Sequence, residues 1–231
     1  MKTIGLIGGI SWVSSAQYYK LINEQVARHL GGSHSAKCIL YSVDFNEIET
    51  LQHKGDWAAL HQMMREAATS LEKAGADCIL ICANTMHLSS DAIREVVSIP
   101  LLHIAEATAL SIKKAGLTKI ALLGTKFTME KDFFKDILKE HGIAPLVPSE
   151  EDRAIVHNVI YKELVKGNIN ASDRKEYQLI IKELEQKGAQ GVILGCTEIP
   201  LLIKQEDVDI PTFDTTTIHA TSAVDFALDR I

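Results

Sequence analysis

Two cysteines, Cys82 and Cys196, each follow a short apolar segment that is typical of a buried β-strand. Each opens a short polar sequence, Ala83-Asn84-Thr85 after the first cysteine and Thr197-Glu198 after the second. A thiol has an ordinary pKa of about 8.5, so a pair of thiols can supply both a base and an acid. A reaction that removes a proton from a carbon beside a carboxylate and returns it on the opposite face needs such a pair. We therefore hypothesise that Cys82 and Cys196 carry the chemistry.

Both cysteines lie within an internal repeat. Residues 3–9 match 119–125, residues 74–85 match 187–198, and residues 99–103 match 210–214. The three matches keep their order at a period of about 110 residues, which indicates a duplicated half. We expect a first half made of residues 1–105 and 215–231, which carries Cys82, and a second half of residues 106–214, which carries Cys196.

The apolar pattern predicts the fold that must position these residues. Short apolar segments alternate with longer helical patterns, as in a parallel sheet covered by helices on both faces. The predicted strands are 3–8, 37–43, 77–81, 100–104, 119–124, 191–194 and 210–213. The predicted helices are 14–30, 56–74, 88–97, 106–115, 128–141, 150–166, 171–187 and 219–231. The fold class is thus α/β, with two pseudo-symmetric halves, each a parallel sheet flanked by helices, and an active site in the cleft between them.

The predicted turns give the thiols a distinctive environment. Ligands of parallel α/β sheets bind beyond the carboxyl ends of the strands, where helix N-termini also point. Because both cysteines lie at strand-to-helix turns, we expect backbone N–H groups and the helix dipole to lower their pKa. Asn84, Thr85 and Thr197 can donate hydrogen bonds to a substrate carboxylate there.

Other interpretations of the cysteines are weaker. A single cysteine on a strand is most often a small buried hydrophobe, the interpretation given to Cys38 and Cys78. Cys78, Cys82 and His87 superficially resemble metal ligands, but the spacing lacks the paired second half of a zinc site. The glycines between Gly5 and Gly9 do not follow the dinucleotide-binding pattern either, and their turn instead lets backbone amides approach a small ligand.

The composition of the 231-residue chain excludes several classes of function. A net charge of −6 and a pI near 5.8, without basic clusters, argue against a nucleic-acid partner. No apolar stretch is long enough to span a membrane. Three glycines interrupt the apolar segment at the N-terminus, which therefore predicts a strand and a turn rather than a signal peptide. We expect a cytoplasmic protein with reduced cysteines.

Three motifs together resemble the aspartate/glutamate racemase family, close to its aspartate racemase and broad-specificity amino-acid racemase branch. They are Ile4-Gly5-Leu6-Ile7-Gly8-Gly9, Cys82-Ala83-Asn84-Thr85-Met86-His87 and Gly195-Cys196-Thr197-Glu198. The resemblance covers essentially the whole chain. It implies a two-domain α/β enzyme, often a homodimer, that racemises free amino acids without pyridoxal phosphate or another cofactor. It also implies that Cys82 and Cys196 are the catalytic acid/base pair.

The resemblance also assigns substrate-binding positions. These are Ile10, Ala83, Asn84, Thr85, Thr125 and Thr197, with Glu198 as a supporting residue beside its thiol. Archaeal-type aspartate racemases carry an arginine after the second strand and a lysine before the strand of the second cysteine. This chain has no arginine at residues 45–49, and Val165 stands at the lysine position between Lys162 and Lys166. Gln52 is our candidate for contacting the substrate side chain, so neutral amino acids are plausible substrates beside aspartate and glutamate.

Two other functions remain open on the same scaffold. One is an isomerase or decarboxylase of a small dicarboxylic acid, and the other is a non-catalytic relative that binds amino acids. Retention of both thiols favours a racemase over a binding protein.

Overall fold

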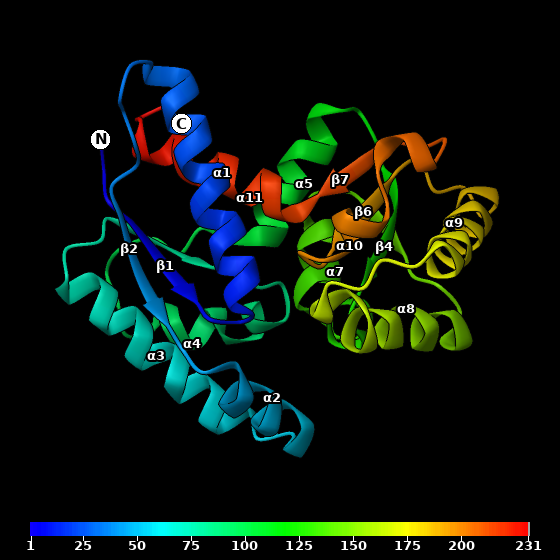
Figure 1. Ribbon diagram of the computed structural model, residues 1–231, viewed down its shortest axis with the longest axis horizontal. Coiled ribbons are helices and arrows are strands. Elements are labelled where there is room, and N and C mark those ends of the chain that lie inside the picture. The colour runs from blue at the N-terminus through cyan, green and yellow to red at the C-terminus, as the bar shows by residue number, and fades with distance from the viewer. Residues whose placement is uncertain (231) are drawn as a thin grey trace. The chain divides into compact units, whose positions relative to one another are not determined.

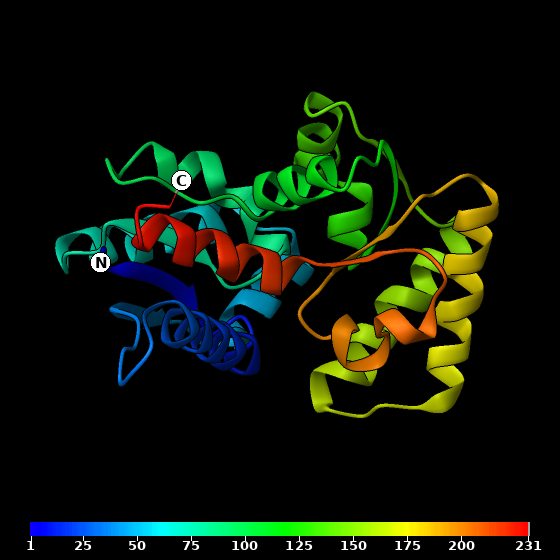
Figure 2. The ribbon, with the colours of Figure 1, turned by 90° about the horizontal axis from the view of Figure 1, so that it is seen from above.

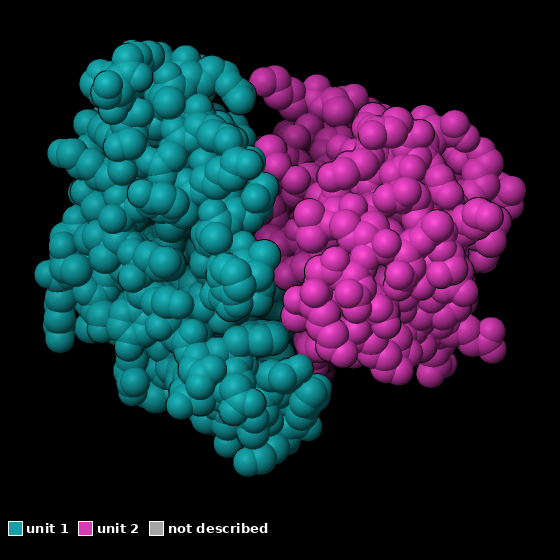
Figure 3. Space-filling view, in the orientation of Figure 1, with its two compact units in different colours: residues 1–104, 219–231 teal, residues 105–218 magenta. Residues whose placement is uncertain are grey.

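The computed structural model describes residues 1–230, which form two compact units (Figure 3). The first unit contains residues 1–104 and the C-terminal segment from residue 219, and the second contains residues 105–218. The chain therefore passes from one unit to the other twice, after Ile104 and before His219.

The first unit is built on a parallel sheet in the order β2-β1-β3 (Figure 1). Its elements are β1 Ile4–Gly8, α1 Trp12–Leu30, β2 Cys38–Ser42, α2 Phe45–Lys54, α3 Trp57–Lys73, β3 Cys78–Ile81, the 3₁₀ helix η1 Thr85–Ser89 and α4 Ser90–Arg94. The central strand β1 is buried at every position, because both of its faces are covered by helices.

Alternate side chains of β1 and β3 pack into two separate cores. Ile7, Ile79 and Ile81 pack against α3 through Met64 and Ala67. The opposite face packs against α1 and against α11 (Thr215–Ala227); Figure 2 shows α11 in red beside the blue strand β1. Burial of each Leu or Ile side chain stabilises the fold by about 1.5–3 kcal/mol, so both faces help to fix the strand ends.

The second unit has a parallel sheet in the order β5-β4-β6-β7. Its elements are α5 Ile104–Lys114, β4 Lys119–Gly124, α6 Lys126–Glu130, α7 Asp132–Glu140, β5 Ala144–Leu146, α8 Glu150–Lys162, η2 Leu164–Lys166, α9 Ala171–Gln186, β6 Val192–Gly195, α10 Ile199–Leu202, η3 Gln205–Asp207 and β7 Thr212–Asp214. Helix α5 begins at the last residue of the first unit, and α11 begins in the second unit and continues into the first.

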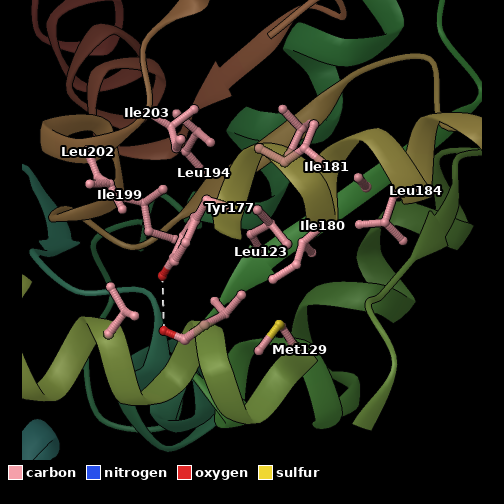
Figure 4. Packing of buried hydrophobic residues seen from close by; sticks show 14 of the residues in the cluster. Leu123, Met129, Tyr177, Ile180, Ile181, Leu184, Leu194, Ile199, Leu202 and Ile203 are labelled. Atoms are coloured by element: carbon pink, nitrogen blue, oxygen red, sulfur yellow. Dashed lines mark hydrogen bonds between the residues drawn. The ribbon is translucent and has the colours of Figure 1, made fainter. Parts of the chain in front are cut away.

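The main core of the second unit lies between the sheet and helices α8, α9 and α10 (Figure 4). Leu123 and Leu194 supply the sheet side of this core, and Tyr177 is its largest fully buried side chain. The Tyr177 hydroxyl donates a hydrogen bond of 2.9 Å to the carbonyl of Val156, so its polar atom is satisfied in the apolar core.

Equivalent backbone hydrogen bonds show the internal repeat in both sheets. The N–H of Asp77 donates to the carbonyl of Thr3, and the N–H of Gln190 donates to that of Lys119, both at 2.8 Å. The N–H groups of Ile79 and Val192 likewise donate to the carbonyls of Pro100 and Pro211. Each unit thus joins the strand that precedes its cysteine to its neighbours in the same way.

Several predicted elements differ in the structure. The strand predicted at 100–104 is a single bridge between Leu101 and Ile79, because the chain enters α5 at Ile104. The helix predicted at 128–141 is broken at Lys131, which is extended, and the helix predicted at 88–97 is reduced to η1 and α4. Strand β5 was not predicted, since it is short and contains a proline. The last predicted helix position, Ile231, lies outside the described residues.

Candidate active site

Cys82 directly follows β3 in the first unit and is fully buried. Its N–H donates to the carbonyl of Ile7 at 2.9 Å, and its carbonyl accepts a hydrogen bond of 2.6 Å from the Ser14 hydroxyl. Strand β1 and helix α1 therefore hold the Cys82 backbone from two sides. Within residues 1–230 the Cys82 thiol makes no hydrogen bond, and it packs in the core with Cys78 and Leu80.

Burial raises the pKa of the Cys82 thiol, and Cys38 raises it further. This corrects our expectation of a lowered pKa. The element that follows Cys82 is the short 3₁₀ helix η1, which has no long array of aligned peptide dipoles. In an apolar environment the cost of a buried charge dominates, so Cys82 is a neutral thiol at neutral pH.

The turn after Cys82 places the other expected residues at the same sheet edge. Asn84 and Thr85 are buried at the start of η1, while Ala83 is half-buried. Ile10 follows β1, the neighbouring strand, and is also buried. Because the carboxyl ends of adjacent parallel strands share one edge, these four residues lie at the same edge of the first sheet as Cys82.

Gln52 reaches the same turn from α2. Its side chain is buried, and its amide Nε2 donates to the sulfur of Met86 at 3.4 Å. Among the described residues its Oε1 atom accepts no hydrogen bond. Gln52 is thus a neutral polar side chain held against the turn of Cys82.

Cys196 follows β6 in the second unit and is half-buried. Its thiol donates to Oε2 of Glu198 at 2.9 Å, and the Thr197 hydroxyl donates to the same oxygen at 2.8 Å. Glu198 is itself buried, with 7% of its side chain exposed, so two donors stabilise a carboxylate that has little access to water.

Burial, together with the negative charge of Glu198 and its hydrogen bond, raises the pKa of the Cys196 thiol well above its ordinary value. Our expectation of a lowered pKa is wrong here too. The backbone N–H groups of Thr197 and Glu198 act in the opposite direction but are the smaller effects. Unlike Cys82, Cys196 has an acceptor for its proton already in place.

Thr125 follows β4, the strand next to β6, and is buried at the N-cap of α6. Its hydroxyl accepts the N–H of Thr128 at 3.4 Å. Gly124 pairs with Gly195 at this edge, and a Cβ atom on Gly195 would lie 2.6 Å from the carbonyl of Leu123. Only glycine permits this close approach, which brings Thr125 and Cys196 to one edge of the second sheet.

Other charged candidates have structural roles or lie in solvent. Asp44 caps the N-terminus of α2, and Asp214 accepts the N–H groups of Thr216 and Thr217 at the start of α11. Lys162 and Lys166 are exposed beside the half-buried Val165.

Sequence reasoning missed Ser14, which fixes the Cys82 carbonyl, and the contacts of His87. The sequence signal for Ser14 was the group of serines at the start of the helix after Gly8-Gly9. A buried serine hydroxyl needs a hydrogen-bond partner, and the partner of Ser14 is the Cys82 carbonyl. Within residues 1–230, no group of three or more His, Cys, Asp or Glu side chains is arranged to hold a metal ion. In the same part of the chain no helix has the length and apolar character to cross a membrane.

Comparison with known proteins identifies relatives along nearly the whole chain. The family model described as Asp/Glu/Hydantoin racemase matches residues 7–223. The broad specificity amino-acid racemase RacX of Bacillus subtilis is 27% identical over 168 residues, which are 71% of this chain and 72% of RacX.

Similar solved structures include proteins from Yersinia pestis and Pyrococcus horikoshii. A candidate Asp/Glu racemase from Yersinia pestis is 52% identical, with a TM-score of 0.94 over 99% of this chain and 100% of its own. An aspartate racemase homologue from Pyrococcus horikoshii is 37% identical, with a TM-score of 0.85 over 99% of this chain and 100% of its own.

Proposed function

The chain belongs to the Asp/Glu/hydantoin racemase family, and we propose that it is an amino-acid racemase that needs no cofactor. Cys82 and Cys196 are its two bases. The observation that carries the proposal is that each unit has a cysteine directly after a buried strand, β3 in the first unit and β6 in the second, at the sheet edge where parallel α/β proteins bind ligands. The proposed reaction requires both thiols to reach the same α-carbon from opposite sides.

Both thiols are protonated at rest, so one must first lose its proton. We propose that Glu198 takes the proton of Cys196 along the existing 2.9 Å hydrogen bond. The Cys196 thiolate then removes the α-proton, and the Cys82 thiol delivers its proton to the opposite face of the carbanion. A solvent proton restores the Cys82 thiol, and Glu198 releases the proton that it took, so the protons balance. The opposite enantiomer reacts with the two thiols in exchanged roles.

The substrate carboxylate accepts charge as the α-proton leaves. Hydrogen-bond donors fixed before the reaction stabilise such charge most effectively. Asn84, Thr85, Thr125 and Thr197 are the proposed donors, with Ile10 and Ala83 forming apolar walls. The two donor pairs come from equivalent sheet edges of the two units.

The proposed substrates are aspartate, glutamate and related amino acids, including those with neutral side chains. The residues at 45–49 include no arginine, and Lys162 and Lys166 are exposed. Gln52, a neutral amide, is the proposed contact for the substrate side chain. The similarity to a broad specificity racemase supports this range.

A racemisation screen in deuterated water tests the proposal. The protein should reduce the optical rotation of an accepted amino acid while deuterium enters at the α-carbon. Cys82→Ser and Cys196→Ser should each reduce racemisation by about 10²- to 10⁴-fold. Each single variant should retain exchange of one enantiomer only, and the two variants should retain opposite ones. Full racemisation by either variant would contradict the two-base mechanism.

We also propose that the enzyme is a cytoplasmic homodimer. Light scattering coupled to size-exclusion chromatography should then give about twice the chain mass of 25.4 kDa. A monomer mass would contradict the proposed assembly without affecting the proposed reaction.

A further inference from the structure

Three buried histidines form a cluster in the first unit. The ring of His87 lies 4.6 Å from that of His103 and 5.5 Å from that of His219, measured between centroids. All three are at least 94% buried. Burial lowers their pKa values, to about 3 for His103 and about 4 for His219, so the rings are neutral at neutral pH.

His87 uses both of its ring nitrogens. Nε2 accepts the N–H of Ile104 at 3.2 Å, so the proton must lie on Nδ1. Nδ1 lies 2.8 Å from the carbonyl of Ala83 and donates to it. The ring thus links the Ala83–Asn84 peptide, one residue beyond Cys82, to the start of α5.

His219 makes an equivalent link with the opposite tautomer. Its Nε2 lies 2.8 Å from the carbonyl of Leu102 and donates to it, while Nδ1 accepts from the buried hydroxyl of Tyr18 at 2.9 Å. One short segment, residues 102–104, is therefore held by His219 at one end and by His87 at the other.

The position of this segment along the chain gives these links their significance. The chain leaves the first unit after Ile104 and returns at His219. The two histidines therefore fasten both crossing points to the body of the first unit, and His87 extends the connection to Cys82.

A metal site or a role in proton transfer does not fit these contacts. Both nitrogens of His87 and of His219 are within hydrogen-bond distance of protein atoms. Backbone atoms hold each ring in one tautomer, which is the arrangement of a structural link rather than of a base.

We propose that His87 is a positioning residue that fixes the Cys82 turn to the segment where the chain leaves the first unit. Its hydrogen bond to the carbonyl of Ala83 sets the direction of the Ala83–Asn84 peptide in the turn after the thiol, and its acceptor nitrogen ties that peptide to α5. The effect expected on racemisation rests on the proposed function, whereas the effect on the Cys82 turn does not.

Three substitutions separate the two hydrogen bonds. The amide of His87→Asn places a donor near the position of Nδ1 and keeps the bond to Ala83. The amide of His87→Gln reaches the position of Nε2, keeps an acceptor for Ile104 and loses the donor. His87→Leu loses both. His141→Asn is the matched control, because that histidine lies in the second unit and contacts Glu106 at 2.6 Å.

The alkylation rate of Cys82, followed by peptide mass spectrometry, tests the link directly. It should be slow in the native protein and rise at least about tenfold in His87→Gln and His87→Leu, whereas His87→Asn should stay near the native rate. Amide exchange of Ile104 should accelerate in His87→Asn and His87→Leu but not in His87→Gln. The kcat should fall in the variants in which Cys82 alkylation rises and stay near the native value in His87→Asn, while KM changes less than about threefold in all of them. His141→Asn should match the native protein in each measurement.

Native Cys82 alkylation in a folded His87→Gln variant would overturn the proposal, as would an equal rise in the Asn and Gln variants. If His87→Leu does not fold, the Asn and Gln variants still decide. A native protein without racemase activity would refute the proposed function alone, because alkylation and amide exchange would still test the link.

Discussion

The two cysteines end equivalent strands, yet they do not occupy equivalent positions. Ile7 pairs with Ile81 in the first sheet, so the next residues along, Gly8 and Cys82, are level. In the second sheet Gly124 pairs with Gly195, and Cys196 comes one residue later. Cys82 therefore corresponds in register to Gly195, and Cys196 corresponds to Ala83.

A shift of one residue changes the face of a sheet to which a side chain belongs. Cys82 packs with Cys78 and Leu80, beneath α1 and α11. Cys196 packs with the core of Val192 and Leu194, which faces α8, α9 and α10. The residues that match Val192 and Leu194 in the repeat pack beneath α3 instead of beside Cys82.

The shift also explains the different surroundings of the two thiols. Cys82 has apolar neighbours and a backbone held by Ser14 and His87, whereas Cys196 has the carboxylate of Glu198 at 2.9 Å. A duplicated scaffold thus supplies two similar sheet edges, while one residue of offset makes the thiols chemically different. Cys196 therefore has a neighbouring carboxylate that can accept its proton, whereas Cys82 has no such acceptor among the described residues.

Moving the first thiol by one residue, to the register of the second, should have the largest effect on racemisation. The double variant Cys82→Ala with Ala83→Cys transfers the thiol to the other face of the first sheet. Racemisation should fall by about 10²- to 10⁴-fold, because the thiol no longer points at the substrate. Polarimetry on the best substrate from the screen measures the loss.

Cys78→Ala is the control for removing a buried thiol from the same strand, and it should racemise at close to the native rate. If the moved thiol supports racemisation as well as the native one, the register offset has no functional importance.

The sequence was sufficient to predict the parallel α/β architecture and the sheet edges that carry the cysteines. Glycines that end helices, such as Gly31 after α1 and Gly116 after α5, gave reliable boundaries, since a left-handed or open conformation is needed there. The strand hydrogen bonds follow the repeated segments, so the repeat also predicted which strands correspond.

The sequence could not predict the surroundings of each thiol. Aligning Cys82 with Cys196 by residue type hides the register offset, although the repeat matches Cys82 with Gly195 and the strand pairing shows the same offset. The link from His219 to Leu102 joins residues that are far apart in the chain. Burial decides the thiol pKa values, and local spacing reveals only the weaker influence of the backbone N–H groups.

Acid should destabilise the protein through the histidines of the first unit. Their pKa values are lowered in the folded protein, to about 4 for His219, while an unfolded histidine titrates near 6.5. The unfolded state therefore binds more protons below pH 6.5, and stability is lost as the pH falls. Between pH 6.5 and pH 5 each such imidazole takes up a proton in the unfolded state but not in the folded state. The free energy of unfolding therefore falls by about 2 kcal/mol for each of them. Urea unfolding at pH 7.5, 6 and 5 measures this loss.

His219→Asn removes one of these groups and should reduce the loss between pH 7.5 and pH 5 by about 2 kcal/mol. An unfolding free energy that stays constant over this range in the native protein would show that the cluster takes up protons without unfolding.

Glu198→Gln tests whether the carboxylate beside Cys196 accounts for the difference between the two thiols. The carboxylate raises the pKa of Cys196, so an uncharged amide of the same size should lower it. A fall of one pKa unit increases the thiolate fraction about tenfold. Alkylation of Cys196 at pH 8 should therefore accelerate about tenfold, while the Cys82 rate in the same sample stays constant. Equal acceleration of both thiols would mean that the variant has loosened the fold instead of changing one local charge.

Gln52→Leu, a change in the first unit, should have the smallest effect on racemisation. The substitution removes an amide that contacts Met86 and keeps the volume similar, so the Cys82 turn stays packed. A neutral hydrogen bond contributes about 0.5–1.5 kcal/mol, so kcat/KM for amino acids with polar side chains should fall about fivefold. The value for alanine should not change, because its methyl group has no polar atom for Gln52 to contact. An equal loss for alanine would place the role of Gln52 in holding the turn rather than in selecting the substrate.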